Sequence, residues 1–311
     1  MPVNTEKPEI NPLSSAAPLH LACAHLRDAW TALRVNGTPH NRSAPYSLGS
    51  AGSESQEFIW KAAEFAIVFA ADSVLDHLRA LALSYEAAAR SQTTWSANEW
   101  PGVTSYTSAR AILEGCALVG WFTNPDIDAE ERLRRGARIR LWSLSEEQAG
   151  PNPPPKEALK FWREKIEDCG MRFRKYGRGW GIEVDGEPRN YSHQAAIKEL
   201  VPTIGRKFYH EWSGLAHHVS WAFADWGRMR VNEETSALRF VFKTHADRHV
   251  ILVSNLAGIV TTAGNSFARY FGRSSDALLA AYEQVFAYLE AEFPHIEAAQ
   301  RRMDVERDGE H

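Results

Sequence analysis

Two apolar segments of the sequence, 105–122 and 204–226, carry polar side chains at a spacing of four residues. On a helix this spacing stacks side chains on one face, roughly 6 Å apart. The residues at these positions whose types could do chemistry are Arg110, Glu114, Tyr209, Ser213 and His217. We take these five as the candidate catalytic residues.

The five residues suit chemistry on an anion. Arg110 could hold a phosphate, with Glu114 orienting its guanidinium group. The imidazole of His217 can give or take a proton near neutral pH, one helical turn from Ser213. No GxSxG motif surrounds Ser213, so the pattern is not a serine-hydrolase signature. The structural alternative is an Arg110–Glu114 ion pair and a buried polar network that locks neighbouring helices together.

A metal site is a further alternative for part of this set. Asp76 and His77 interrupt a long apolar segment, and they could act as ligands if Glu114 and His217 converge on them. Neither HExxH nor the paired ExxH of di-iron bundles is present. We therefore expect no metal and no cofactor.

Basic and aromatic side chains are interleaved along residues 132–180. Such a mixture could hold a nucleic-acid backbone and stack on its bases. The predicted RNA-binding residues are Arg135, Arg138, Arg172, Arg174, Lys175 and Trp180. The alternative is a solvated helix face whose basic residues are balanced by neighbouring glutamates.

Helices must position most of these residues, because apolar side chains recur at helical spacing along nearly the whole chain. The predicted ranges are about 14–37, 55–92, 105–122, 128–148, 156–176, 192–200 and 204–226, with two more helices beginning near 247 and 274. The Asp185–Gly186 pair predicts a small hairpin, and the segment 238–243 reads as extended. The expected fold is all-α, a bundle or orthogonal array of seven to eight helices with at most a minor β-hairpin.

The composition fits one large helical domain. The chain has 311 residues, 44% of them hydrophobic, and a net charge of −4. We expect a disordered lead over 1–12, a single domain over 13–300 with sub-layers 13–149 and 156–300, and a flexible tail over 301–311. The many aromatic residues in predicted loops favour a homodimer.

The N-terminal sequence has acidic residues and prolines where a signal peptide would be basic and then apolar. The three cysteines stand alone, without a CxxC pair, and each lies in an amphipathic segment. We read them as reduced thiols. The expectation is a cytoplasmic protein with no membrane association.

Three segments together resemble a known group of proteins: ADSVLDHLRAL, then ARAILEGCALVGWFTNPDIDAEERLRRGARIRLWSLSEEQ, then FYHEWSGLAHHVSWAF. They resemble a family of uncharacterised helical proteins common in actinobacteria, which is distantly similar to the HEPN superfamily of nucleotide- and RNA-associated domains. The resemblance implies a place in a stress or defence system, such as a toxin–antitoxin pair.

In HEPN ribonucleases an arginine and a histidine four to six residues apart cleave RNA without a metal, often across a dimer. The two local matches here are Arg34 with His40 and Arg239 with His245, but nonpolar residues follow both arginines. An equivalent pair would have to assemble in space, and Arg110 with His217 is the candidate.

The leading hypothesis is thus a HEPN-like protein that binds or cleaves RNA or a nucleotide without a metal. The alternatives are a non-catalytic helical scaffold or interaction protein and, last, a metal-dependent hydrolase that uses Asp76, His77, Glu114 and His217.

Overall fold

The computed structural model describes residues 12–35, 52–90, 103–151, 153–177, 179–203, 205–217, 227–231, 238–242 and 246–293. Within these ranges the protein has nine helices and two small antiparallel sheets, which confirms the all-α prediction with minor β-structure. The expected tail over 301–311 lies outside the described residues. So does the expected lead over 1–12, except Pro12, which begins the first helix.

The helices are α1 (Pro12–Val35), α2 (Glu54–Arg90), α3 (Val103–Thr123), α4 (Ala129–Ala149), α5 (Lys156–Asp168), α6 (His193–Leu200), α7 (Gly205–Ala216), α9 (Ala246–Tyr270) and α10 (Asp276–Glu292). Local sequence explains two of their beginnings. The Asp128 carboxylate accepts a hydrogen bond from the backbone N–H of Glu131 at the start of α4. Ser192 caps α6 in the same way through the N–H of Ala195.

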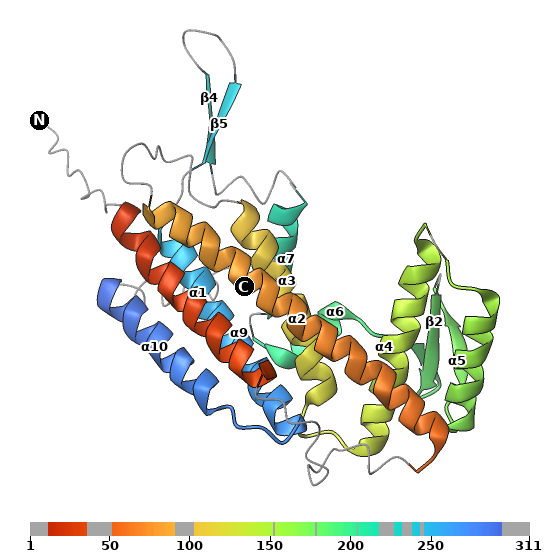
Figure 1. The fold of residues 1–311 in the computed structure, drawn as a ribbon. Helices are drawn as coiled ribbons and strands as arrows, with labels where there is room; N and C mark the ends of the chain where they lie inside the picture. The colour runs from red at the N-terminus through yellow and green to blue at the C-terminus, as the bar shows by residue number, and fades with distance from the viewer. Residues whose placement is uncertain are drawn as a thin grey trace, which may run out of the picture.

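Helix α2 is the longest element and runs through the molecule (Figure 1). Helices α1, α9 and α10 pack together beside it, and α3 lies against both α2 and α9. At its N-terminal end α2 contacts α4 and α5, which flank the first small sheet (Figure 1). The other side of α3 packs against α6 and α7. Helix α3 therefore contributes side chains both to the core and to the candidate site.

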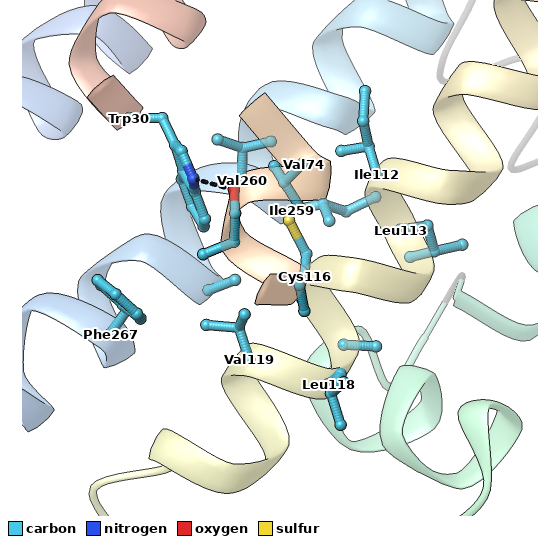
Figure 2. Packing of buried hydrophobic residues seen from close by; sticks show 14 of the residues in the cluster. Trp30, Val74, Ile112, Leu113, Cys116, Leu118, Val119, Ile259, Val260 and Phe267 are labelled. Atoms are coloured by element: carbon cyan, nitrogen blue, oxygen red, sulfur yellow. Dashed lines mark hydrogen bonds between the residues drawn. The ribbon is translucent and has the colours of Figure 1, made fainter. Parts of the chain in front are cut away.

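The core between α1, α2, α3 and α9 is built from aliphatic and aromatic side chains (Figure 2). Trp30 of α1 stacks on Phe267 of α9 and donates its indole N–H to the carbonyl oxygen of Ala71, 2.9 Å away. Cys116 of α3 is fully buried in the same cluster. Burial raises the pKa of its thiol, as it does for Cys23, which keeps both thiols protonated.

The first sheet contains β1 (Phe173–Tyr176), β2 (Gly179–Val184) and β3 (Glu187–Arg189), paired antiparallel in that order. The predicted hairpin at Asp185–Gly186 is confirmed, and both residues have positive φ, 54° and 81°. The helix predicted over 156–176 is wrong beyond Asp168. Gly170, with a φ of 75°, ends α5, and Phe173 then pairs with Ile182 as a strand.

The second sheet pairs β4 (Gly227–Val231) with β5 (Leu238–Phe242), which confirms the predicted extended segment. Helix α7 is described from Gly205 to Ala216; residues 218–226 of the longer predicted helix lie outside the described residues.

By length and hydropathy alone, one described helical stretch, Arg248–Tyr270 of α9, could cross a membrane. In the structure 61% of its most apolar window is buried against other parts of the protein.

Candidate functional site

Arg110, Glu114 and His217 meet where α3 lies against the end of α7. The Nε of Arg110 donates to the Glu114 carboxylate at 2.9 Å, and a terminal nitrogen of the same guanidinium lies 2.6 Å from Nε2 of His217. The four-residue spacing on α3 accounts for the first bond, because i and i+4 share a helix face. The second bond joins residues 107 positions apart and depends on the packing of α3 on α7.

Tyr209 completes one side of the cluster. The Arg110 guanidinium lies over its ring, 5.6 Å from the centroid, in a cation–π contact. Ser213 lies between Tyr209 and His217 on α7, and its carbonyl oxygen accepts the backbone N–H of His217 at 2.9 Å. The structure therefore gathers Arg110, Glu114, Tyr209 and His217 through side-chain contacts, and Ser213 through the helix backbone.

The cluster lies at the surface. The side chains of Arg110 and Glu114 are 21% and 24% exposed, and His217 is exposed. Water therefore reaches a guanidinium, a carboxylate and an imidazole at one place. The Arg110–Glu114 ion pair of the structural alternative is therefore present, but the cluster is partly open to solvent and not buried as that alternative expected.

Sequence reasoning missed two residues next to this cluster, Tyr191 and His193. The Tyr191 hydroxyl lies 3.1 Å from Nδ1 of His193. Burial lowers the pKa of His193, and the charge on Arg110 lowers it further, whereas Glu114 and Glu146 oppose the shift. The His193 imidazole is therefore held neutral within the field of the Arg110–Glu114 pair. The helix predicted over 192–200 was the only sequence signal near these residues.

Arg135 and Arg138 are engaged in holding the fold, which argues against their predicted role in RNA binding. Arg135 is buried, donates to the carbonyl oxygen of Trp121 near the end of α3 at 2.6 Å, and forms ion pairs with Glu131 and Glu199. Arg138 donates to the carbonyl oxygen of Asn190 at 3.0 Å. Both guanidinium groups lie over the Trp121 ring, 4.7 Å from its centroid. Arg135 and Arg138 are therefore not part of the proposed RNA-binding surface.

The other predicted RNA-binding residues lie on the first sheet. Arg172 and Arg174 are exposed, and both form ion pairs with Glu183 across the strands. Lys175 is also exposed, opposite Trp180 in the strand register. The Trp180 indole stacks on Phe173 and donates its N–H to Gln148. One face of the ring is therefore covered and is not available to stack on a base.

The metal-binding alternative is not assembled in the described residues. No group of three or more His, Cys, Asp and Glu side chains comes together within the described ranges. Asp76 faces outward and lies 3.8 Å from Arg79, while Glu114 and His217 both contact Arg110. The two local arginine–histidine matches cannot be compared, because His40 and His245 lie outside the described residues.

Comparison of the chain with protein-family models, with curated proteins and with solved structures gave no significant match.

Proposed function

We propose that the protein binds RNA or a nucleotide through a phosphate at Arg110, and that His217 can act as acid or base in metal-independent cleavage, as in the HEPN-like proteins that the sequence resembles. The observation that carries the proposal is the 2.6 Å contact between the Arg110 guanidinium and Nε2 of His217 at an exposed surface. A guanidinium is the preferred side chain for bidentate phosphate binding.

The neighbouring residues fit a positioning role. Glu114 holds the Nε edge of the guanidinium and leaves the two terminal nitrogens, one of them shared with His217, to face a ligand. Tyr209 lies under the guanidinium plane. A phosphate arriving at Arg110 would take over the hydrogen bond now made to His217. The imidazole would then be free, within hydrogen-bond reach of the phosphate oxygens.

The sheet offers a second contact region for a longer strand. Arg172, Arg174 and Lys175 are exposed on β1 and its approach. Their charge is partly neutralised by Glu183, so we assign them a minor, salt-sensitive share of RNA affinity.

The proposal is tested by fluorescence anisotropy with a labelled single-stranded RNA and by gel assays of cleavage in a chelator. We expect Arg110→Ala and His217→Ala to weaken binding or abolish cleavage, with at least a tenfold loss for Arg110→Ala. Arg134→Ala is the matched control, because Arg134 forms an exposed pair with Glu130 at the same four-residue spacing. If both variants change only the melting temperature, the proposal is wrong.

A second candidate, an interaction protein, is favoured by the outer face of α2. Phe65 and Phe69 are 75% and 69% exposed there, which is unusual for phenylalanine. Lys61 precedes this pair on the helix, and Asp76 follows it. Two copies of α2 crossing antiparallel at the phenylalanines would set Lys61 of each copy near Asp72 and Asp76 of the other. We therefore propose a second copy of this chain as the occupant.

Sedimentation velocity tests this association. The double variant Phe65→Ser with Phe69→Ser should shift the protein toward monomer, whereas Leu83→Ser, at an exposed position further along α2, should not. A monomeric wild-type protein at tens of micromolar would rule out the homodimer.

A further inference from the structure

A pocket of about 560 Å³ lies between α4, the first sheet and the segment that leads into α6. Its volume is within the range of small-molecule sites. Six of its lining residues bear on what it could hold: Trp142, Glu146, Gln148, Tyr176, Asn190 and Tyr191. None of these belongs to the five candidate catalytic residues.

The wall between α4 and β2 depends on one glycine. A Cβ atom at Gly179 would lie 2.2 Å from the hydroxyl oxygen of Ser145, so β2 can approach α4 this closely only without a side chain. The same hydroxyl accepts the backbone N–H of Trp180 at 3.1 Å. This wall of the pocket is therefore fixed by the close packing of Gly179 on Ser145 and by the hydrogen bond from Trp180.

Aromatic rings supply the apolar part of the lining. Trp142 and Tyr191 contact each other, with ring centroids 5.2 Å apart, on the side formed by α4 and the approach to α6. Tyr176, at the end of β1, is exposed and lines the same pocket. The Trp142 and Tyr176 rings suit stacking on a flat aromatic ligand. By contrast, Tyr191 is only 5% exposed and packs against Trp121, Trp142 and His193.

The polar lining combines one carboxylate with two amides. Glu146 forms no ion pair with the described residues, and no arginine or lysine is among the described residues that line the pocket. The amide oxygen of Gln148 accepts from the Trp180 indole at 3.1 Å, and that of Asn190 accepts from the Tyr191 backbone N–H at 2.7 Å. Each amide oxygen thus already accepts one hydrogen bond, and the two amide NH₂ groups are donors.

This donor and acceptor set discriminates among flat ligands. A carboxylate accepts two adjacent N–H groups, and an amide donor pairs with a carbonyl oxygen. Of the common nucleobases, guanine alone presents a ring N–H and an exocyclic NH₂ side by side, next to a carbonyl oxygen. A cation held by the aromatic rings would satisfy Glu146 but would leave the amide donors facing a positive charge.

Tyr191 and His193 connect the pocket to the Arg110 cluster. Tyr191 lines the pocket, and its hydroxyl contacts His193. Burial raises the pKa of Tyr191, and the nearby charges of Glu114 and Tyr209 add to the shift. Besides burial, the charge of Arg110 lowers the pKa of His193, and the charges of Glu114 and Glu146 raise it. The charges of the Arg110 cluster and of Glu146 in the pocket lining therefore both act on His193, whose ring also contacts Trp142 of the pocket at a centroid distance of 5.1 Å.

We propose that this pocket binds the guanine base of the nucleotide, or of the RNA residue, whose phosphate is held at Arg110. Glu146 would accept the two N–H groups of the base, Trp142 and Tyr176 would contact its faces, and the buried Tyr191 would hold the Trp142 ring in place. This inference rests on the proposed function, since it deepens the substrate class of the same site.

The test is calorimetric titration with guanosine 5′-monophosphate (GMP), the adenosine analogue, guanosine, ribose 5-phosphate and choline. We expect GMP to bind at least tenfold more tightly than the adenosine analogue, and Glu146→Gln to remove that preference because an amide places a donor against the guanine N–H groups. Glu147→Gln is the matched control, since Glu147 pairs with Arg140 and does not line the pocket. Circular dichroism melts verify that each variant folds.

The results with the different ligands distinguish the guanine pocket from the phosphate site at Arg110. If ribose 5-phosphate binds through Arg110 as tightly as GMP does, the guanine pocket is wrong and the phosphate site stands. If guanosine binds through Glu146 while Arg110→Ala leaves GMP affinity unchanged, the pocket stands and the phosphate site is wrong. Choline binding without guanosine binding would overturn the guanine assignment in favour of a cation. The absence of binding by every probe would overturn both proposals.

Discussion

Arg110 and His217, 107 positions apart in the chain, lie 2.6 Å apart through a guanidinium nitrogen and Nε2 of the imidazole. Because an arginine can only donate, Nε2 must accept, and the proton of the neutral ring resides on Nδ1. We expect ¹⁵N spectra of His217 to show this tautomer in the free protein.

A phosphate ligand should change that signal. Inorganic phosphate or a nucleotide that takes over the Arg110 contact would release Nε2, so its resonance should shift on titration. His77 on α2 serves as the internal control, since it lies outside the cluster. An unchanged His217 signal at saturating nucleotide would contradict the exchange of partners that the proposed function requires.

A second prediction concerns the character of the cation at position 110. Arg110→Lys keeps the charge but cannot contact Glu114 and a phosphate in the same fixed geometry. We expect RNA affinity to fall about threefold, a smaller loss than the tenfold or more expected for Arg110→Ala. Anisotropy titrations at two salt concentrations would check this. Equal affinity of the lysine variant and the wild type would mean that only net charge matters at this site.

The sequence predicted the helical part of the fold well because apolar periodicity is a local property. The side chains of Leu19, Cys23, Leu26, Trp30 and Leu33, which recur at helical spacing in the sequence, are all buried on α1, and Asp128 caps α4. The end of α5 was missed, because basic and aromatic residues continue past Gly170 at a spacing that a helix would also accept. Only pairing with β2 shows that Phe173–Tyr176 is a strand.

The candidate site was predictable in part for the same reason. Arg110 and Glu114 share a helix face, so their contact follows from spacing, whereas the contact with His217 depends on how α3 packs on α7. Tyr191 and His193 bear no periodic relation to either helix. Arg135 and Arg138 read as a solvated basic face, yet they bind carbonyl oxygens near the end of α3 and in the approach to α6.

Arg132 gives the sharpest prediction on stability. It is fully buried and donates to the carbonyl oxygens of Phe122, Asn124 and Ile127 where α3 ends. Arg132→Met would leave these acceptors without their donor and should lower the free energy of unfolding by about 3 kcal/mol. Arg134→Met, on the exposed face of α4, should cost less than about 0.5 kcal/mol. Urea unfolding of both variants compares the two costs, and equal costs would contradict the role of Arg132.

Two glycines on α9 form a matched pair for testing the core. A Cβ at Gly264 would lie 2.3 Å from a Leu278 methyl carbon and 2.9 Å from the Trp30 ring, whereas one at Gly258 would meet nothing within 4 Å. Gly264→Ala should destabilise the protein by about 1–3 kcal/mol through overpacking. Gly258→Ala should stabilise it by about 0.5–1 kcal/mol through helix propensity. Thermal melts showing the same sign for both would contradict the packing of α1, α9 and α10.

His249 predicts how stability depends on pH. Its imidazole is fully buried on α9, with Nδ1 2.9 Å from the Tyr85 hydroxyl, and burial lowers its pKa from 6.5 to about 4. Between these values the unfolded chain binds a proton that the folded protein does not, so stability falls as the pH drops from about 6.5 to 4. The loss through this one group approaches about 3 kcal/mol. His249→Gln removes the titration, so its free energy of unfolding should fall less steeply across that window, whatever its stability at pH 7. Parallel slopes for the wild type and His249→Gln in urea unfolding from pH 7 to 4 would show that the imidazole takes up its proton within the fold.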